Sequence, residues 1–209
     1  LLLSSTACGA AQISSNATSE ERNIKTELAT KENQITGITE LSESETDSTH
    51  TGTETLVVYF SATGHTKAVA EKIADVTGAD LYEIVPADPY CEADLDYNDD
   101  QCRANIEMND PNVRPEIAGE PISLDAYSTI YLGYPIWWGD APRIMSTFVE
   151  SYDFSNQTII PFCTSGSSKI DKSESNLKTQ SGGGNWLAGS RLDADSSEEE
   201  IQSWIDGLS

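Results

Sequence analysis

The chain has 209 residues, of which 12 are Lys or Arg and 35 are Asp or Glu, so its formal net charge is −23. A charge this negative repels nucleic-acid phosphates and anionic lipid headgroups, and we therefore predict no nucleic-acid partner. Hydrophobic residues make up only 37% of the chain, which indicates that part of it does not contribute to a packed core.

The first eight residues resemble the end of a bacterial lipoprotein signal segment. Leu1, Leu2 and Leu3 are followed by small residues up to Cys8, and in lipoproteins the cysteine at this place is acylated. Ser5 differs from the leucine that is usual three places before that cysteine. We expect lipidation of Cys8 and an exported protein, on the cell-surface or periplasmic side of a bacterial membrane, that contacts the membrane only through this anchor. The alternative is an ordinary secretory signal or a terminus with a chance cysteine.

Residues 9–53 are predicted to be a disordered tether. No Phe, Tyr or Trp occurs in residues 1–53, while Ser, Thr and Glu recur without a period. Such a segment buries too little surface to offset the entropy lost on ordering. Residues 54–209 are long enough for one domain with a single core, and they contain no apolar run of the roughly 18 residues that a membrane-spanning helix needs.

The predicted domain begins with a strand, a loop and a helix. Thr55–Phe60 is a continuous apolar run of β-branched and aromatic residues, which is typical of a strand buried on both faces. Apolar residues then recur at helical spacing from Ala68 to Gly78, and Leu81–Val85 predicts a second strand. The three elements form one βαβ unit, which indicates a parallel sheet.

A long connection, residues 86–127, follows the second strand, and its middle, Glu92–Asp110, has moderate helical character. The remaining predicted elements alternate between strand and helix: Ser128–Tyr134, Ala141–Tyr152, Gln157–Cys163, Asp171–Thr179, Asn185–Leu192 and Ser197–Leu208. Ser197 and Glu200 have the spacing of a capping box at the start of the last helix.

Five strands that alternate with helices predict a doubly wound α/β fold, in which helices cover both faces of a parallel sheet. The commonest small version has the strand order 2-1-3-4-5. In that order, three loops that leave neighbouring strands meet at one rim of the sheet. They are the first loop (residues 61–66), the second loop (residues 135–142) and the third loop (residues 164–168), and we expect a ligand there.

The first loop has the composition of a phosphate site. Ser61, Thr63 and Thr66 supply hydroxyls, Gly64 allows close backbone approach, and free N–H groups open the following helix. The alternative is a simple helix cap. The loop lacks the lysine of a Walker A loop and the spacing of a dinucleotide turn, so it favours the terminal phosphate of a mononucleotide.

The second loop contains the adjacent residues Trp137 and Trp138. Neighbouring side chains point apart, so at least one ring is expected to face solvent or a ligand, and a stacked planar ring would bury it. The alternative places one tryptophan in the core and the other at a protein interface.

Three segments together resemble the flavodoxin-like FMN-binding family, and in particular its short bacterial branch with a Pro-Ile-Trp-Trp-Gly loop. They are Val57–Thr66, Tyr134–Gly139 and Pro161–Gly166. The resemblance implies a flavodoxin-like fold over residues 54–209 and FMN bound without a covalent link. The implied cofactor-binding residues are Ser61, Ala62, Thr63, Gly64, His65 and Thr66 around the phosphate, and Pro135, Ile136, Trp137, Trp138, Gly139, Thr164, Ser165 and Gly166 around the ring.

Two positions depart from the family pattern. His65 replaces the usual asparagine, and Ser167-Ser168-Lys169 replaces a more glycine-rich continuation of the third loop. Both departures bear on how tightly the site holds FMN. His65 either adds positive charge at the phosphate or simply faces solvent at the helix start.

The expected function is electron transfer between a redox partner protein and a second partner or small electron acceptor. The first alternative is an FMN-dependent reductase that passes electrons from NAD(P)H to a quinone, nitro or azo compound. The second is a flavin-free surface lipoprotein that keeps the fold. Neither catalytic side chains nor metal ligands are predicted, because no triad order, nucleophile elbow or zinc spacing occurs.

The long connection contains Tyr97, Arg103, Glu107 and Arg114, which either cover the flavin and bind a substrate or form a solvated surface. It also contains Cys91 and Cys102, and export permits a disulfide. Two cysteines eleven residues apart in one helix lie about 16 Å from each other, so a bridge requires Cys91 to precede the helix. Cys163, at the end of a buried strand, is expected to be a packed thiol.

Overall fold

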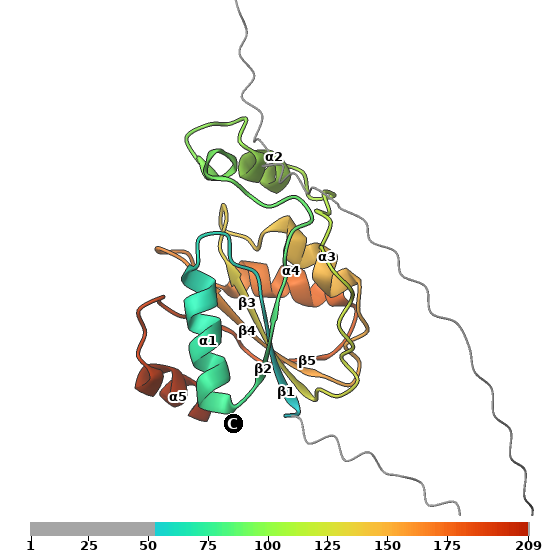
Figure 1. Ribbon diagram of the computed structural model, residues 1–209, viewed down its shortest axis with the longest axis vertical. Coiled ribbons are helices and arrows are strands. Elements are labelled where there is room, and N and C mark those ends of the chain that lie inside the picture. The colour runs from blue at the N-terminus through green and yellow to red at the C-terminus, as the bar shows by residue number, and fades with distance from the viewer. Residues whose placement is uncertain (1–52, 209) are drawn as a thin grey trace, which may run out of the picture. The chain divides into compact units, whose positions relative to one another are not determined.

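A parallel β-sheet lies between two layers of helices (Figure 1). The computed structural model describes residues 53–208. The predicted signal end with Cys8 lies outside the described residues, as does the predicted tether apart from Thr53.

The sheet has the strand order β2-β1-β3-β4-β5, and β6 also pairs with β4. Every strand pair is parallel. The strands are β1 (Thr55–Tyr59), β2 (Asp80–Glu83), β3 (Thr129–Pro135), β4 (Thr158–Thr164), β5 (Asn185–Trp186) and β6 (Ser190–Arg191). The predicted order 2-1-3-4-5 is confirmed, with β5 and β6 sharing the fifth position.

The prediction of one continuous fifth strand, Asn185–Leu192, is wrong. Two carbonyl groups of β4 accept from this segment: Ile159 from the N–H of Leu187 at 3.0 Å, and Cys163 from the N–H of Leu192 at 2.9 Å. Pro161 lies between these two positions and has no N–H with which to continue the ladder. At Gly189 the chain runs so close to Pro161 that an added Cβ would lie 2.6 Å from the Pro161 oxygen. The proline therefore divides the fifth strand in two.

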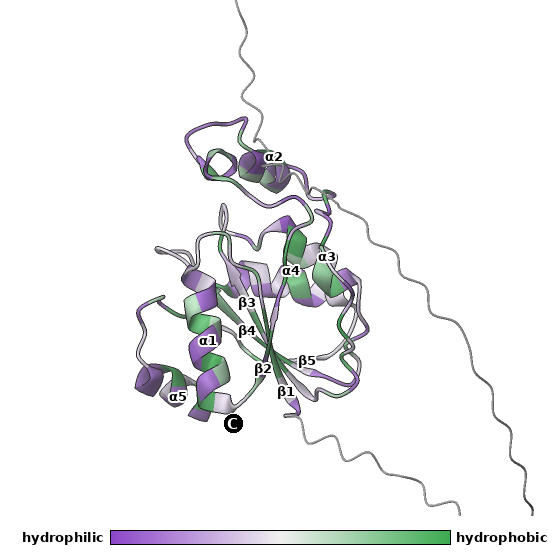
Figure 2. Cartoon of the chain, viewed as in Figure 1, coloured by the Kyte–Doolittle hydropathy of each residue, from purple (hydrophilic) through white to green (hydrophobic). Residues whose placement is uncertain are grey.

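The helices cover both faces of the sheet, which confirms the predicted three layers. In Figure 1, α1 (His65–Thr77) and α5 (Glu198–Asp206) lie on one face, and α3 (Arg143–Glu150) and α4 (Asp171–Ser181) lie on the other. Alternate residues of β1 divide between two cores: Val57 and Tyr59 pack toward α1 and α5, while Leu56 and Val58 pack toward α3 and α4. Phe60, directly after β1, belongs to the same core as Leu56 and Val58. The hydropathy colours of Figure 2 show the same apolar strands and apolar α3. The predicted capping box of Ser197 and Glu200 is present at the start of α5.

The helical middle of the long connection is shorter than predicted. It contains a 3₁₀ turn, η1 (Glu92–Leu95), and a seven-residue helix, α2 (Arg103–Asn109). Between them, the side chains of Asp96 and Asp99 accept hydrogen bonds from the backbone N–H groups of Asn98 and Gln101. Such local bonds compete with the helical hydrogen bonds and keep the segment irregular.

Cys91 precedes α2, as a disulfide with Cys102 requires. Cys102 is nevertheless a free thiol, and its Sγ accepts a hydrogen bond from the N–H of Asn105. The two cysteines are therefore not joined in the structure.

Candidate functional site

The three predicted loops meet at the carboxyl edge of the sheet. They enclose a cavity of about 420 Å³, here called the rim pocket, which falls in the usual size range of small-molecule sites. Its lining is Ser61, Ala62, Thr63, His65, Thr66, Leu95, Tyr97, Pro135, Ile136, Trp137, Thr164, Ser165, Gly166, Leu192, Asp193 and Ala194. All but three of the predicted cofactor-binding residues line this pocket. The exceptions are Gly64, Trp138 and Gly139.

The first loop ends at the N-terminus of α1. Gly64 is the N-cap with φ of 87°, and its N–H donates to Ser61 Oγ at 3.1 Å. A Cβ added at Gly64 would meet no atom within 4 Å, so open space lies above the helix start. Thr66 is buried, and its hydroxyl lies 2.8 Å from that of Thr164. This bond joins the first loop to the third loop.

The second loop contains a tight hairpin. Trp137 and Asp140 exchange two backbone hydrogen bonds of 2.9 and 3.0 Å around Trp138 and Gly139. Both turn residues have positive φ, 51° and 72°, as a type I′ turn requires. Glycine adopts this conformation readily, whereas Trp138 does so against its steric preference.

The two tryptophan rings point apart. Trp137 is 4% exposed and packs edge-on against Tyr90, with ring centroids 5.2 Å apart. Trp138 is 62% exposed, donates its indole N–H to Asn105 of α2, and packs edge-on against Tyr97. Trp137 therefore forms a wall of the rim pocket, while Trp138 connects the hairpin to the long connection.

Asp140, which the sequence analysis did not single out, anchors the hairpin. Its side chain is nearly buried, and one carboxylate oxygen accepts the N–H of Ala141 at 2.9 Å. The other oxygen accepts from the amide of Asn176 at 2.8 Å and lies 3.6 Å from Lys172 Nζ. Since both partners belong to α4, this carboxylate fixes the second loop to that helix.

The third loop closes without additional glycines. Ser165 Oγ accepts the N–H groups of Ser167 and Ser168 at 3.2 and 2.7 Å. Of the described residues other than glycine, only Trp138 has positive φ, so the Ser167–Lys169 departure causes no backbone strain of that kind. Arg191 of β6 donates to the carbonyl groups of Ser165 and Gly166 and thereby braces the loop.

The long connection contributes to the rim pocket through Leu95 and Tyr97. Tyr97 is among the residues named from the sequence, whereas Leu95 and residues 192–194 are not. These last residues follow β6 at the same edge of the sheet, so the rule that placed the other loops would have found them. Arg114 forms a two-pronged ion pair with Glu150 of α3, outside the pocket.

A buried network holds the long connection in place. Arg103 Nε lies 2.6 Å from a carboxylate oxygen of the buried Glu107, whose other oxygen accepts the hydroxyl of Tyr90. Burial and this hydrogen bond raise the pKa of Tyr90. Arg143 of α3 donates to the Met108 carbonyl at 2.9 Å. Arg103 and Glu107 are therefore structural partners rather than rim-pocket residues.

Comparison with known proteins identifies the family. Residues 54–208 match the family model described as flavodoxin. The chain belongs to the flavodoxin family. No curated protein matches it.

Solved structures agree with this membership. A candidate flavoprotein from Bacteroides uniformis is 47% identical, with 74% of this chain and 99% of that chain covered and a TM-score of 0.71. One from Bacteroides eggerthii is 44% identical, with 74% and 96% covered and a TM-score of 0.69. A flavoprotein from Lactobacillus acidophilus, solved in complex with FMN, is 24% identical, with 72% and 97% covered and a TM-score of 0.55, and it shows the same fold.

In this flavodoxin domain Cys163 is fully buried, and burial raises the pKa of its thiol to about 12. It is a packed, protonated thiol at neutral pH, as predicted. Within residues 53–208, no group of three or more His, Cys, Asp or Glu side chains is placed to hold a metal ion. In the same range, no helix is both long and apolar enough to cross a membrane.

Proposed function

We propose that the rim pocket binds FMN without a covalent link. The observation that supports this most strongly is the combination of surfaces in one cavity. At one end lies the open start of α1, whose dipole and N–H groups favour a phosphate. At the other end lie Pro135, Ile136 and the buried Trp137, which form an apolar and aromatic wall suited to a planar ring. The family membership and the FMN complex of the Lactobacillus relative agree with this ligand.

The residues present fit the proposed cofactor. Ser61, Ala62, Thr63, His65 and Thr66 would surround the phosphate at the helix start that Gly64 caps, and Pro135, Ile136, Trp137, Thr164, Ser165 and Gly166 would surround the ring. Trp138 and Gly139 would act by holding the hairpin in shape, because they do not line the rim pocket.

When bound, FMN supplies one- and two-electron transfer. The protein's part is to bind, orient and shield it. The Thr66–Thr164 bond holds the first and third loops together, and the N–H of Ile136 donates to the Thr164 carbonyl at 3.0 Å, which joins the second loop to the same point. We propose that the domain carries electrons between a redox partner protein and another partner or small acceptor.

A reductase is the second candidate function, and one observation favours it. A larger cavity of about 900 Å³ adjoins the rim pocket and shares Ala62, Thr63 and Leu95 with it. Such a cavity offers space for a small electron acceptor beside the proposed flavin. Turnover of NAD(P)H with a quinone by the protein alone would favour the reductase over the carrier.

The test of FMN binding is a titration of the full chain, followed by flavin absorption and fluorescence. We expect quenched fluorescence and shifted visible bands. Thr63→Glu places a carboxylate against the phosphate and is expected to weaken FMN binding by about 100-fold, while riboflavin, which lacks the phosphate, is affected far less. Thr179→Glu, at an exposed position of α4, is the matched control. Absence of FMN binding to the folded protein would refute the proposal and favour the flavin-free alternative.

We further propose that the protein is exported and anchored by acylation of Cys8, on the basis of residues 1–8 alone. Expression in bacteria with a radiolabelled or alkyne-tagged fatty acid should label the wild type and leave Cys8→Ser unlabelled. Equal labelling of both proteins would contradict the anchor.

A further inference from the structure

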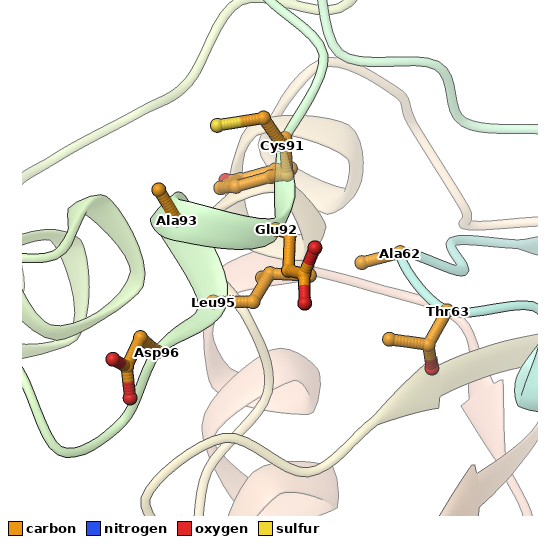
Figure 3. A pocket seen from close by; sticks show the side chains of 8 residues that line it. Ala62, Thr63, Cys91, Glu92, Ala93, Leu95 and Asp96 are labelled. Atoms are coloured by element: carbon orange, nitrogen blue, oxygen red, sulfur yellow. The ribbon is translucent and has the colours of Figure 1, made fainter. Parts of the chain in front are cut away.

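The cavity that adjoins the rim pocket, here called the side pocket, lies between the first loop and the long connection. Ala62 and Thr63 form one side, and Tyr90, Glu92, Leu95 and Asp96 are among the residues on the other. Figure 3 shows the Glu92 carboxylate extending from η1 into the space that faces Ala62 and Thr63. A ligand in the side pocket would therefore lie next to the proposed flavin.

The side pocket has a fixed aromatic wall. The Tyr90 ring packs edge-on against Trp137 and lies 5.8 Å from the ring of Phe60. Its hydroxyl is held by the buried Glu107. Leu95 and Ala62 add apolar surface beside it. Such a wall favours a flat aromatic ligand over a flexible polar one.

The charged side chains that line the side pocket are all acidic. Carboxylates of Glu92 and Asp96 line it, and the described residues of its lining include no lysine or arginine. Asp94, in the same turn, accepts the N–H of Cys91, which holds the pKa of its carboxyl below the ordinary value. The guanidinium group of Arg103 lies over the Tyr90 ring, 4.1 Å from its centroid.

Arg103 offsets this negative charge only in part. It pairs with Glu107 at 2.6 Å and with Asp88 at 3.3 Å, so two carboxylates already share its single positive charge. An anionic ligand in the side pocket would face the Glu92 and Asp96 carboxylates with no cation in the lining itself, while a cationic ligand would gain from them.

We propose that the side pocket is a binding site for a flat heteroaromatic cation and that it rejects anions. The proposal deepens the proposed function, because it names the class of small molecule that would lie beside FMN. All residues that line the side pocket belong to the protein itself, so ligand binding there can be measured both with and without FMN.

The test uses three bicyclic probes of similar shape and different charge: the dication methyl viologen, neutral 4,4′-bipyridine and the dianion biphenyl-4,4′-disulfonate. Binding to the full chain is measured by calorimetry, with and without FMN. We expect methyl viologen to bind about 10-fold more tightly than bipyridine at low salt, since it faces two carboxylates, and to lose this advantage as salt is added. The dianion is expected not to bind.

Variants locate the site. Glu92→Gln and Asp96→Asn should each weaken methyl viologen binding by about 2- to 5-fold and leave bipyridine binding unchanged. Glu120→Gln removes an exposed carboxylate of the same long connection outside the side pocket and should change neither. These three substitutions lie at exposed positions and should leave the folded structure intact.

The outcomes separate the two proposals. Equal affinities for the dication and the neutral probe, or viologen binding that neither Glu92→Gln nor Asp96→Asn weakens, would overturn the side-pocket proposal even if FMN binds. Charge-dependent binding to the apoprotein, with the expected losses in both variants, would support it even if FMN binding fails, and that failure would then refute the proposed function alone.

Discussion

Gly133→Ala tests how tightly the central strands are packed. Gly133 of β3 is paired in register with Phe162 of β4, and an added Cβ would lie 2.2, 2.6 and 2.8 Å from the three outermost ring atoms of Phe162. Carbon atoms in favourable contact are about 3.5–4.0 Å apart, so the overlap exceeds about 1 Å. Phe162 is fully buried, and its ring lies against Trp204, with centroids 6.5 Å apart.

The alanine at position 133 therefore fits only if the Phe162 ring turns or one of the strands β3 and β4 shifts. Overpacking of this kind costs about 1–3 kcal/mol, and we expect about 3 kcal/mol because paired strands hold both residues. Urea unfolding of the full chain gives the free energy of unfolding. In Phe162→Leu, which removes the colliding ring, Gly133→Ala should cost about 2 kcal/mol less than in the wild type.

The control is Gly183→Ala. This glycine has no positive φ, and its closest neighbour to an added Cβ, Ser155 Oγ, is 3.4 Å away, so the free energy of unfolding should change by less than about 1 kcal/mol. A cost below about 1 kcal/mol for Gly133→Ala, or the same cost in the Phe162→Leu background, would show that the ring yields freely and would refute the reasoning.

Three further predictions concern the loops and the core. Asp140→Ala removes the carboxylate that fixes the second loop to α4, and it should lower the free energy of unfolding by about 2 kcal/mol, measured in urea. Arg191→Leu releases the third loop, and it should weaken FMN binding several-fold in the fluorescence titration with little loss of stability. Burial raises the pKa of the Cys163 thiol from 9.0 to about 12, so the thiol of the unfolded chain loses its proton at a lower pH than that of the folded protein. The free energy of unfolding should therefore be unaffected by this thiol below pH 9 and fall by about 1.4 kcal/mol per pH unit between about pH 9 and pH 12.

For each of these three predictions, a control variant or a specific measured result would contradict the reasoning. Asp125→Ala, at an exposed carboxylate of the long connection, should leave stability almost unchanged, and an equal loss in both aspartate variants would contradict the anchoring role of Asp140. Unchanged FMN affinity in Arg191→Leu would show that the third loop does not need bracing. For Cys163, the comparison is the pH dependence of Cys163→Ala, and parallel curves above pH 9 would exclude the thiol as the source.

The strands and their order were predictable because the signals for them are local. After Thr55, the run Leu56–Phe60 consists of aliphatic and aromatic residues without interruption, as a strand covered on both faces requires. Once the strands alternate with helices, topology alone brings the three loops together at one edge. Most of the rim pocket therefore follows from a short stretch of sequence after each of three strands.

What the sequence analysis missed depends on contacts between distant segments. The break in the fifth strand is caused by Pro161, which belongs to the neighbouring strand. Leu95 lines the rim pocket from the short turn η1, and side-chain bonds of Asp96 and Asp99 follow it where a continuous helix was expected. The outward turn of Trp138 depends on its unusual backbone conformation, which residue type does not reveal.

The interrupted fifth strand also affects how the domain meets its own copies. A sheet edge with unused backbone groups can recruit another chain and begin aggregation. Here one edge consists of two strands of only two residues each, and the other edge, β2, has four residues and carries Asp80 and Glu83. The edge formed by β5 and β6 offers another sheet too few aligned backbone N–H and C=O groups for pairing. The β2 edge of one copy carries carboxylates that repel the same edge of a second copy. The fold is therefore protected against edge-to-edge polymerisation even where many copies are crowded together.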